Sequence, residues 1–466
     1  MTGSVAVVGL GKIGLPLAVA IAGSSRQVIG ADLNQRVLEL VSGGTPPFPG
    51  EPELAGRLRA AVRRGFLRIT ADTAAAVRDS EVVIIVVPLV IDSARRPDYS
   101  ALDAAARAVA TGLQPGTLVI VETTVPVHTT RQRIAGTLAQ GSGLLPGLDF
   151  SVCYSPERVS SGSVFADLAR YPKLVGGIDE TSGHRAAEFY MSVLQFDERP
   201  DLHRPNGVWD LGSAEAAELT KLAETTYRDV NIALANEFAR FAEVAGLNVF
   251  AVIEAANSQP YSHIHQPGIA VGGHCIPVYP WLYAAGDPQA VLPVAARRVN
   301  DAVPGRAVGL LDRLAGRLDG RRVVVLGAAY RGGVREVAFS GVFATVRALR
   351  QHAAIPAVHD PLYEDADLIE MGFSPYHFGE PCDAAIVQAD HREYSLIGPG
   401  SLPGIRALVD GRSVTDPVLW AGVPRLVLGA GHEILALPER TRGHAHEHFV
   451  RAGVPRHDST GAYNGE

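Results

Sequence analysis

Short runs of apolar residues recur through the N-terminal part of the chain, separated by stretches with helical spacing of apolar positions. Unbroken Val- and Ile-rich runs that alternate with helices are typical of a parallel β-sheet with both faces covered. The predicted strands are Val5–Val8, Gln27–Ala31, Val82–Val87, Leu118–Val121 and Ser151–Tyr154.

The segment Ser213–Ala245 has a different pattern, because neither Gly nor Pro interrupts it and its apolar positions approximate helical spacing. This pattern predicts one helix, longer than the usual three to four turns. Its place between two α/β regions makes it a natural dimer interface. The positions that define the spacing are Leu219, Leu222, Thr226, Val230, Ala233, Ala235, Phe238 and Phe241.

A second alternation of apolar runs and helices begins near Gly320. We therefore predict an α/β fold with two Rossmann-like doubly wound domains joined by a long central helix. The expected units are residues 1–205, 206–305, 306–435 and a tail, 436–466, whose His-, Arg- and Gly-rich sequence predicts poor order. The strands of the second sheet are expected at Arg322–Leu326, Ile355–His359, Ala384–Val387 and Ala407–Val409.

Composition narrows the classes of function. The 466 residues carry a net charge of −7 without a basic stripe, which argues against a nucleic-acid partner. We find no signal peptide and no apolar run of about 20 residues that would span a membrane. Three cysteines, Cys153, Cys275 and Cys382, are too few for a disulfide framework and suit the reducing cytoplasm. We expect no bound metal.

A glycine motif follows the first predicted strand. Gly9, Gly11 and Gly14 precede an apolar helix, and Asp32 stands at the end of the next strand. Such glycines let the backbone approach a pyrophosphate at a helix N-terminus, while the carboxylate accepts hydrogen bonds from a ribose. The combination predicts NAD rather than NADP as the cofactor. The alternative is a glycine turn that serves packing alone.

Three further residues are candidates for chemistry. Cys275 lies beside glycines in Gly272-Gly273-His274-Cys275, where the thiol is accessible, although an intracellular cysteine is more often a small buried apolar residue. Lys221 shares a helix face with polar neighbours, and from this pattern alone it is a solvated lysine. Glu157 follows a strand, where ligand sites lie in such sheets, but a solvated loop glutamate is the alternative.

Taken together, these segments resemble the UDP-glucose/GDP-mannose dehydrogenase family, and most of all its branch that oxidises UDP-N-acetylmannosamine and related N-acetylhexosamines. The resemblance extends roughly over residues 4–430, with several motifs in the same order. The matching strings are Val8-Gly9-Leu10-Gly11-Lys12-Ile13-Gly14-Leu15-Pro16, Glu122-Thr123-Thr124-Val125-Pro126, Ser155-Pro156-Glu157-Arg158-Val159, Lys221-Leu222-Ala223-Glu224-Thr225-Thr226-Tyr227-Arg228-Asp229-Val230-Asn231, and Pro267-Gly268 with Gly272-Gly273-His274-Cys275-Ile276-Pro277.

The resemblance implies an NAD-dependent oxidation of a sugar CH2OH to a carboxylate, giving a uronic acid for polysaccharide biosynthesis. Cys275 would be the nucleophile that forms a thiohemiacetal and then a thioester, Lys221 the proton donor or acceptor, and Glu157 the base that activates water. It also implies a homodimer, with NAD in the first domain and a nucleotide sugar, expected to be UDP-linked, in the third. The implied cofactor residues are Gly9, Gly11, Lys12, Ile13, Gly14, Asp32 and Thr124, and the implied substrate residues are Arg158, Val159, Lys221, Thr225, Arg228, Gly272, Tyr330, Arg331 and Arg412.

Five departures from the family pattern lie near this site. Thr225 replaces an asparagine and Tyr279 an aspartate, Gln259-Pro260-Tyr261 stands for His-Pro-Arg, and Arg331 replaces a lysine. An Asp-Asp-x-Arg element is matched by Arg335-Glu336-Val337-Ala338, without the arginine at its end. A lost polar contact costs about 1–3 kcal/mol when its partner is left unpaired, so the usual N-acetylmannosamine substrate is expected to be poor.

The sequence therefore predicts a dehydrogenase with a changed substrate. Two alternatives remain: an enzyme on the same fold that stops after one oxidation or oxidises transiently for epimerisation, and a binding protein without catalysis. Retention of both Cys275 and Lys221 argues against the binding protein, which would need neither.

Overall fold

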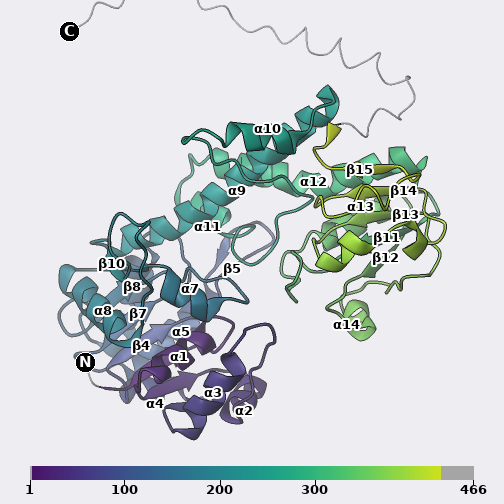
Figure 1. Cartoon of the computed structure of the whole chain (residues 1–466). Helices are drawn as coiled ribbons and strands as arrows, with labels where there is room; N and C mark the ends of the chain where they lie inside the picture. The colour runs from purple at the N-terminus through teal and green to yellow at the C-terminus, as the bar shows by residue number, and fades with distance from the viewer. Residues whose placement is uncertain (1–2, 432–466) are drawn as a thin grey trace, which may run out of the picture.

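The computed structural model describes residues 3–431, so the predicted tail, 436–466, lies outside the described residues. An eight-stranded sheet occupies the N-terminal part of the chain, in the order β10-β9-β8-β7-β4-β1-β2-β3 (Figure 1). Its strands β3-β2-β1-β4-β7-β8 are parallel and follow the order of dinucleotide-binding sheets. The strands are β1 (Val5–Val8), β2 (Val28–Ala31), β3 (Leu67–Thr70), β4 (Val82–Ile85), β7 (Leu118–Val121), β8 (Ser151–Tyr154), β9 (Lys173–Gly177) and β10 (Val208–Asp210).

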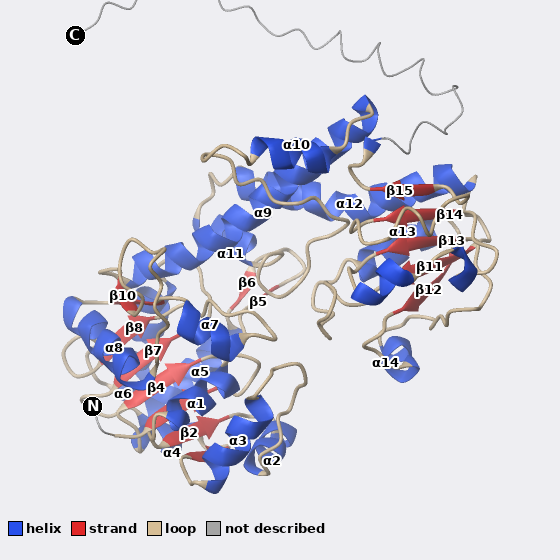
Figure 2. Ribbon diagram, in the orientation of Figure 1, coloured by secondary structure: helices blue, strands red, loops and turns tan. Residues whose placement is uncertain are grey.

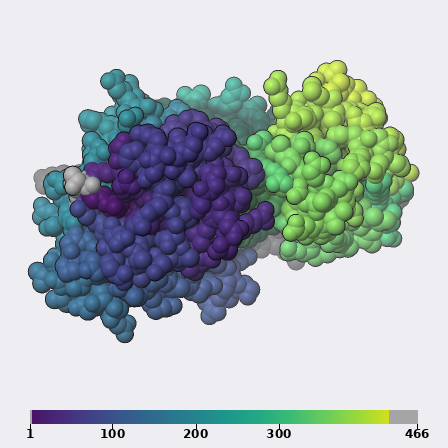
Figure 3. All heavy atoms as spheres, turned by 90° about the horizontal axis from the view of Figure 1, so that it is seen from below, coloured from purple at the N-terminus to yellow at the C-terminus, as the bar shows by residue number. Residues whose placement is uncertain are grey.

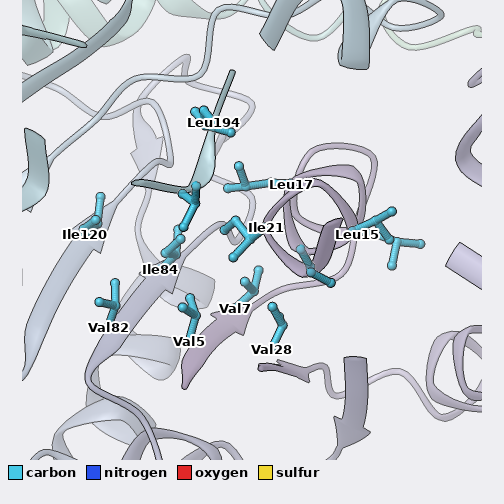
Figure 4. Packing of buried hydrophobic residues seen from close by; sticks show 14 of the residues in the cluster. Val5, Val7, Leu15, Leu17, Ile21, Val28, Val82, Ile84, Ile120 and Leu194 are labelled. Carbon is cyan, nitrogen blue, oxygen red and sulfur yellow. The ribbon is translucent and has the colours of Figure 1, made fainter. Parts of the chain in front are cut away.

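Helices cover both faces of this sheet. Val5 and Val7 of β1 pack with Leu17 and Ile21 of α1 (Figure 4), while the alternate β1 residues enter the core on the opposite face. The helices are α1 (Gly14–Gly23), α2 (Gln35–Ser42), α3 (Leu54–Arg63), α4 (Thr73–Arg78), α5 (Ser100–Gly112), the π-helix η1 (Thr129–Ile134), α6 (Ala135–Ser142), α7 (Val164–Arg170) and α8 (Glu180–Val193), and a small hairpin pairs β5 (Val90–Ile91) with β6 (Pro97–Asp98).

A 32-residue helix, α9 (Ala214–Ala245), runs from the first sheet towards the second part of the chain (Figure 2). The Ser213 side chain caps its N-terminus by accepting a hydrogen bond from the Ala216 backbone N–H. The other helices of this central region are α10 (Val249–Ala256), α11 (Tyr279–Gly286) and α12 (Leu292–Ala315), and the last of these packs along α9.

A second, all-parallel sheet of five strands has the order β12-β11-β13-β14-β15. Its residues and those of the first sheet form two masses that lie side by side (Figure 3). The elements are β11 (Arg322–Leu326), α13 (Val342–Gln351), β12 (Ile355–His359), α14 (Asp365–Glu370), β13 (Ala384–Val387), the 3-10 turns η2 (Arg392–Leu396) and η3 (Pro399–Ser401), β14 (Ala407–Asp410) and β15 (Arg425–Val427).

The predicted α/β fold with two doubly wound sheets and a long connecting helix is confirmed. One difference concerns β9, which runs antiparallel to β8 and was not predicted. In α9, the helix predicted as a dimer interface, Leu219, Phe238 and Phe241 are 45%, 39% and 64% exposed. Within residues 3–431, no helix is both long and apolar enough to cross a membrane.

Candidate active site

The glycine turn between β1 and α1 has the backbone geometry that a dinucleotide site requires. Gly9 has a φ of +99°, and a Cβ there would lie 2.3 Å from the Val86 carbonyl oxygen. A Cβ on Gly14 would lie 2.0 Å from the Gly9 oxygen, whereas the space around Gly11 is open. Only glycine therefore permits this turn, and Gly11 leaves room for a pyrophosphate to approach the backbone.

Asp32 closes the same turn at the end of β2. Its carboxylate accepts hydrogen bonds from the backbone N–H groups of Leu10 (2.7 Å) and Asn34 (2.8 Å). The acidic group is thus fixed beside the glycine turn, where it fits the ribose of a bound NAD. Ile13 precedes α1 as its N-cap residue.

Lys12 links the glycine turn to the second half of the chain. Its ammonium forms an ion pair with Glu336, whose carboxylate also lies 3.7 Å from His274 Nε2. Burial lowers the pKa of Lys12 and that of His274. Lys12 and Glu336 border a cavity of about 420 Å³ between the two parts of the chain, lined also by residues 48–52, 161–163, 331 and 333–335.

Lys221 and Glu157 come into direct contact. The Lys221 ammonium, on the third turn of α9, donates to the backbone oxygen of Glu157, in the loop after β8. Lys221 is only 7% exposed, and its neighbours on the same face, Glu218 and Thr225, are also buried. The expectation of a solvated lysine is therefore wrong: the polar face of this part of α9 packs against the first sheet.

Cys275 lies just before α11, in the loop that follows the two glycines. Its backbone oxygen accepts the Tyr279 N–H at 2.9 Å, and its thiol is a polar neighbour of the Tyr279 hydroxyl, as is the Thr124 hydroxyl. The Tyr279 ring also lies 5.9 Å from the Lys221 ammonium. Burial, together with the Cys275 thiol, raises the pKa of Tyr279, so its hydroxyl stays protonated. Tyr279 thereby brings Cys275, Thr124 and Lys221 into one group.

The three cysteines differ in their surroundings. Cys153 and Cys382 are buried, and burial raises the pKa of each thiol. Cys275 is partly exposed. Since the thiolate is the reactive form, and a thiol must be reached to react, Cys275 is the cysteine whose position suits nucleophilic chemistry.

A second group of predicted residues gathers around Tyr330, in the loop after β11. A Cβ on Gly272 would lie 2.5 Å from the Tyr330 Cβ, so the two loops pack closely. Arg412 donates to the backbone oxygens of Tyr330 (3.0 Å) and Ala270 (3.2 Å), and Arg331 donates to the Tyr330 hydroxyl and to the Ser161 oxygen. These contacts tie the Cys275 loop to the second sheet.

Other predicted substrate residues form hydrogen bonds or ion pairs within the protein. Arg158 forms an ion pair with Glu224, and the Val159 N–H donates to Glu157 Oε1. The Thr225 hydroxyl is within hydrogen-bonding distance of the helix oxygens of Lys221 and Leu222, at 3.0 and 3.1 Å. Arg228 is exposed on α9, near His265.

The structure also locates the departures from the family pattern. Tyr261 is 92% exposed in the loop after α10. The loop after β11 does hold an arginine, Arg335, which borders the cavity and pairs with Asp367 at 2.7 Å. This loop therefore carries an arginine, although at position 335 and not at position 338, where the family pattern has one.

Sequence reasoning missed Glu122 and Lys173, which form a buried ion pair beside Glu157. A compositional signal was available: among 42 basic residues the chain contains only three lysines, Lys12, Lys173 and Lys221. Each of the three contacts a carboxylate or a backbone oxygen of the candidate site: Lys12 pairs with Glu336, Lys173 with Glu122 and Glu157, and Lys221 donates to the Glu157 backbone oxygen.

Comparisons with known proteins agree with this arrangement. The model of the UDP-glucose/GDP-mannose dehydrogenase family NAD binding domain matches residues 3–194, and that of the family's central domain matches residues 215–301. A UDP-N-acetyl-D-mannosamine dehydrogenase of Pyrococcus horikoshii is 35% identical over 88% of this chain and 95% of its own length. An NDP-N-acetyl-D-galactosaminuronic acid dehydrogenase of Ralstonia nicotianae is 34% identical over 75% of this chain and 80% of its own.

Solved structures give the same result. That of a UDP-D-ManNAc dehydrogenase from Pyrococcus horikoshii superimposes with a TM-score of 0.82 at 33% identity, covering 92% of this chain and all of the other. A UDP-glucose dehydrogenase from Pyrobaculum islandicum gives a TM-score of 0.80 at 26% identity, covering 92% and 98%.

Proposed function

Because this chain belongs to the UDP-glucose/GDP-mannose dehydrogenase family and is an NAD-dependent nucleotide-sugar dehydrogenase, we propose that it oxidises a sugar CH2OH to a carboxylate through Cys275. The observation that supports this most is the meeting of Lys221, Glu157 and Cys275 with Tyr279 and Thr124. Cys275 and Lys221 both adjoin Tyr279, and Lys221 contacts the backbone oxygen of Glu157. A nucleophile, a cation and a base are what such an oxidation requires.

Each residue has a role that fits its contacts. Lys221, as the neutral amine, takes the hydroxyl proton of the alcohol, and the ammonium that forms stabilises the oxyanions that develop on the substrate oxygen. The Cys275 thiolate adds to the aldehyde carbon and forms a thiohemiacetal, whose oxidation gives a thioester. Glu157 accepts a proton from the water that cleaves the thioester, which releases the carboxylate and the thiol. Gly9, Gly11, Gly14 and Asp32 would hold NAD, which would supply the acceptor for the hydride that leaves the sugar C6 in each oxidation.

For the substrate we propose a nucleotide-linked N-acetylhexosamine, with UDP as the nucleotide. The support is the branch of the relatives, which are named for UDP-N-acetyl-D-mannosamine and an N-acetyl-D-galactosaminuronic acid. In this proposal residues 1–205 bind NAD, residues 206–305 provide Lys221, Cys275 and the dimer interface, and residues 306–435 hold the nucleotide sugar. Gly272, Tyr330, Arg331 and Arg412 line the side of the site formed by the second sheet.

A homodimer in the cytoplasm completes the proposal. Tyr227, Leu234, Phe238 and Phe241 recur at helical spacing on one side of α9 and are 55%, 42%, 39% and 64% exposed. An exposed apolar face of this extent is typical of an interface between subunits. The three cysteines are free thiols, which suits a reducing compartment.

The direct test is to incubate the purified protein with NAD and a panel of UDP-linked hexoses and N-acetylhexosamines, and to count NADH per sugar consumed. We expect two NADH per carboxylate with an N-acetylhexosamine. UDP-N-acetylmannosamine should be a poor substrate, because Tyr261 and Arg331 replace the usual residues and no arginine stands at Ala338. Turnover of that sugar at ordinary efficiency would show the substrate argument to be wrong.

The number of NADH formed per sugar also distinguishes a single oxidation, a transient oxidation and a binding protein without catalysis. One NADH per sugar would indicate a single oxidation, and an epimeric product without net NADH would indicate transient oxidation. Binding of the sugar without any reaction would contradict the proposal and favour a binding protein.

A further inference from the structure

The carboxylates of Glu122 and Glu157 pair with one ammonium, that of Lys173, in the interior of the domain that contains the first sheet. Lys173 Nζ, at the start of β9, lies 2.9 Å from Glu122 Oε1 and 3.2 Å from Glu157 Oε2. The three side chains are 5%, 0% and 11% exposed. Buried charges of this kind persist only when they are paired, so the three groups form one electrostatic unit.

The unit has more negative than positive charge. Glu122 Oε1 accepts the Tyr190 hydroxyl of α8, but Glu122 Oε2 has no hydrogen-bond partner among the described residues. Burial raises the pKa of Glu122 to about 7, against the opposing effect of Lys173. Burial also opposes the ionisation of Glu157, yet Lys173 and the Arg158 N–H outweigh it and lower the pKa of Glu157.

Glu157 is held at three of its atoms. Lys173 contacts Oε2, the Arg158 N–H donates to Oε1 at 2.6 Å, and Lys221 donates to the backbone oxygen. The two buried lysines therefore converge on a single glutamate from different elements, β9 and α9. Two further ionisable neighbours are the Tyr190 hydroxyl, beside Glu122 and Lys173, and the Cys153 thiol of β8, and burial raises the pKa of both so that they stay protonated.

We propose that Lys173 is a positioning residue that holds Glu157 in its ionised form, with Glu122 as the counter-charge that fixes Lys173. The inference rests on the proposed role of Glu157 as the base of the hydrolytic step. A base must be unprotonated to accept a proton from water, and burial alone would favour the neutral acid. Lys173 supplies the positive charge that reverses this preference.

The arrangement makes different predictions for Lys173 and Glu122. Lys173→Met keeps an unbranched chain but removes the cation, so the pKa of Glu157 should rise. Glu122→Gln replaces a carboxyl group that is already protonated at the pH where Glu157 titrates, so the pKa of Glu157 should stay in place. A residue with a merely structural role would impair both variants without moving the pH dependence in either.

The experiment measures the rate of carboxylate release in a single turnover as a function of pH, by rapid quenching. Compared with the wild type, the acid limb should move by about one pH unit or more to higher pH in Lys173→Met and stay in place in Glu122→Gln. Glu243→Gln is the matched control, because Glu243 is also a buried, paired carboxylate, on the far part of α9, and should leave the limb in place. An acid limb that does not move in Lys173→Met, or that moves as far in Glu122→Gln, would overturn the inference.

A second readout needs neither substrate nor cofactor. Infrared difference spectra of the protein alone should show the C=O band of a buried carboxylic acid that titrates near pH 7, and Glu122→Gln should lack it. In Lys173→Met a second such band, from protonated Glu157, should appear at a pH where the wild type lacks it. If no nucleotide sugar reacts, the proposed function fails while this second band still decides the inference. If Lys173→Met does not fold, Lys173→Gln, which also removes the cation, takes its place in both measurements.

Discussion

At the scale of single residues, exposure and polar contacts distinguish Cys275 from the other two cysteines. Cys153 and Cys382 are enclosed, whereas Cys275 is reachable and lies beside Tyr279. Without the family resemblance, the sequence favours a small buried apolar residue at Cys275 and a solvated lysine at Lys221, because neighbours in space are not neighbours in the chain. The burial of Lys221 against the Glu157 backbone is such a contact, across 64 positions.

Asp32 should determine the choice of cofactor. Its carboxylate would repel the 2′-phosphate of NADP and would accept hydrogen bonds from a ribose hydroxyl of NAD. We expect Asp32→Ala to lower kcat/KM for NAD by about 10- to 100-fold, since a hydrogen bond to a charged group is worth about 1.5–3 kcal/mol. Because Asp32 also accepts the Leu10 N–H, Asp32→Asn is the better variant: it retains an acceptor and should relax the NAD preference. Comparable kcat/KM for NAD and NADP in the wild type would contradict this prediction.

Tyr279 offers a second test at this scale. Its hydroxyl stays protonated and faces Cys275, so it is placed to donate a hydrogen bond to the thiolate. Tyr279→Phe keeps the ring near Lys221 but removes the donor, and we expect kcat to fall by about tenfold or more. Tyr283→Phe, one turn further along α11, is the matched control and should lower kcat little. Equal activity in the wild type and Tyr279→Phe would remove Tyr279 from the reaction.

At the scale of elements, the predicted strands and helix boundaries agree closely where the sequence has one strong pattern. Val5–Val8, Leu118–Val121 and Arg322–Leu326 are strands with the predicted limits, since continuous apolar runs are buried on both faces. The strand β9 escaped prediction because Lys173 begins it and two glycines end it. In α9, periodicity indicates that a stripe of apolar residues exists but does not indicate which partner covers it.

The contact between two loops gives a prediction at this scale. Gly272→Ala would place a Cβ 2.5 Å from the Tyr330 Cβ and 3.0 Å from the Phe339 oxygen. Overpacking of this kind costs about 1–3 kcal/mol, and relief of the clash would move the Cys275 loop away from the second sheet. We expect kcat to fall by tenfold or more while the Kd for NAD stays unchanged. Gly286→Ala, where a Cβ meets open space, is the control, and equal kcat for both variants would show that the close packing does not matter.

At the scale of the whole molecule, the exposed face of α9 bears on assembly. We expect the protein to be a dimer at micromolar concentration, and Phe238→Glu with Phe241→Glu to give a monomer, because a charge cannot be buried in an apolar interface without a partner. Light scattering after size-exclusion chromatography measures the mass. Leu396→Glu, an equal change at a residue that is 78% exposed on η2, should leave the dimer intact. A monomeric wild type would contradict the prediction.

The two sheets and the connecting helix could be predicted from sequence, since they follow from local patterns. The site could be predicted only in part, because it forms where the loop after β8, α9 and the Cys275 loop meet. Lys173 and Glu122 belong to that site through tertiary contacts alone. The sequence signal for Lys173 was the rarity of lysine in this chain, whose other basic residues are nearly all arginines.

The number of NADH formed per sugar by the Cys275→Ser variant tests whether the reaction proceeds through a Cys275 thioester. Serine has a far higher pKa than cysteine and forms no thiolate, so thioester formation should fail. The variant should bind NAD as the wild type does, yet form no carboxylate from a nucleotide sugar that the wild type oxidises with two NADH. Cys382→Ala, at a buried thiol remote from the site, should keep that stoichiometry. Two NADH per sugar at the wild-type rate in Cys275→Ser would contradict the thiol mechanism.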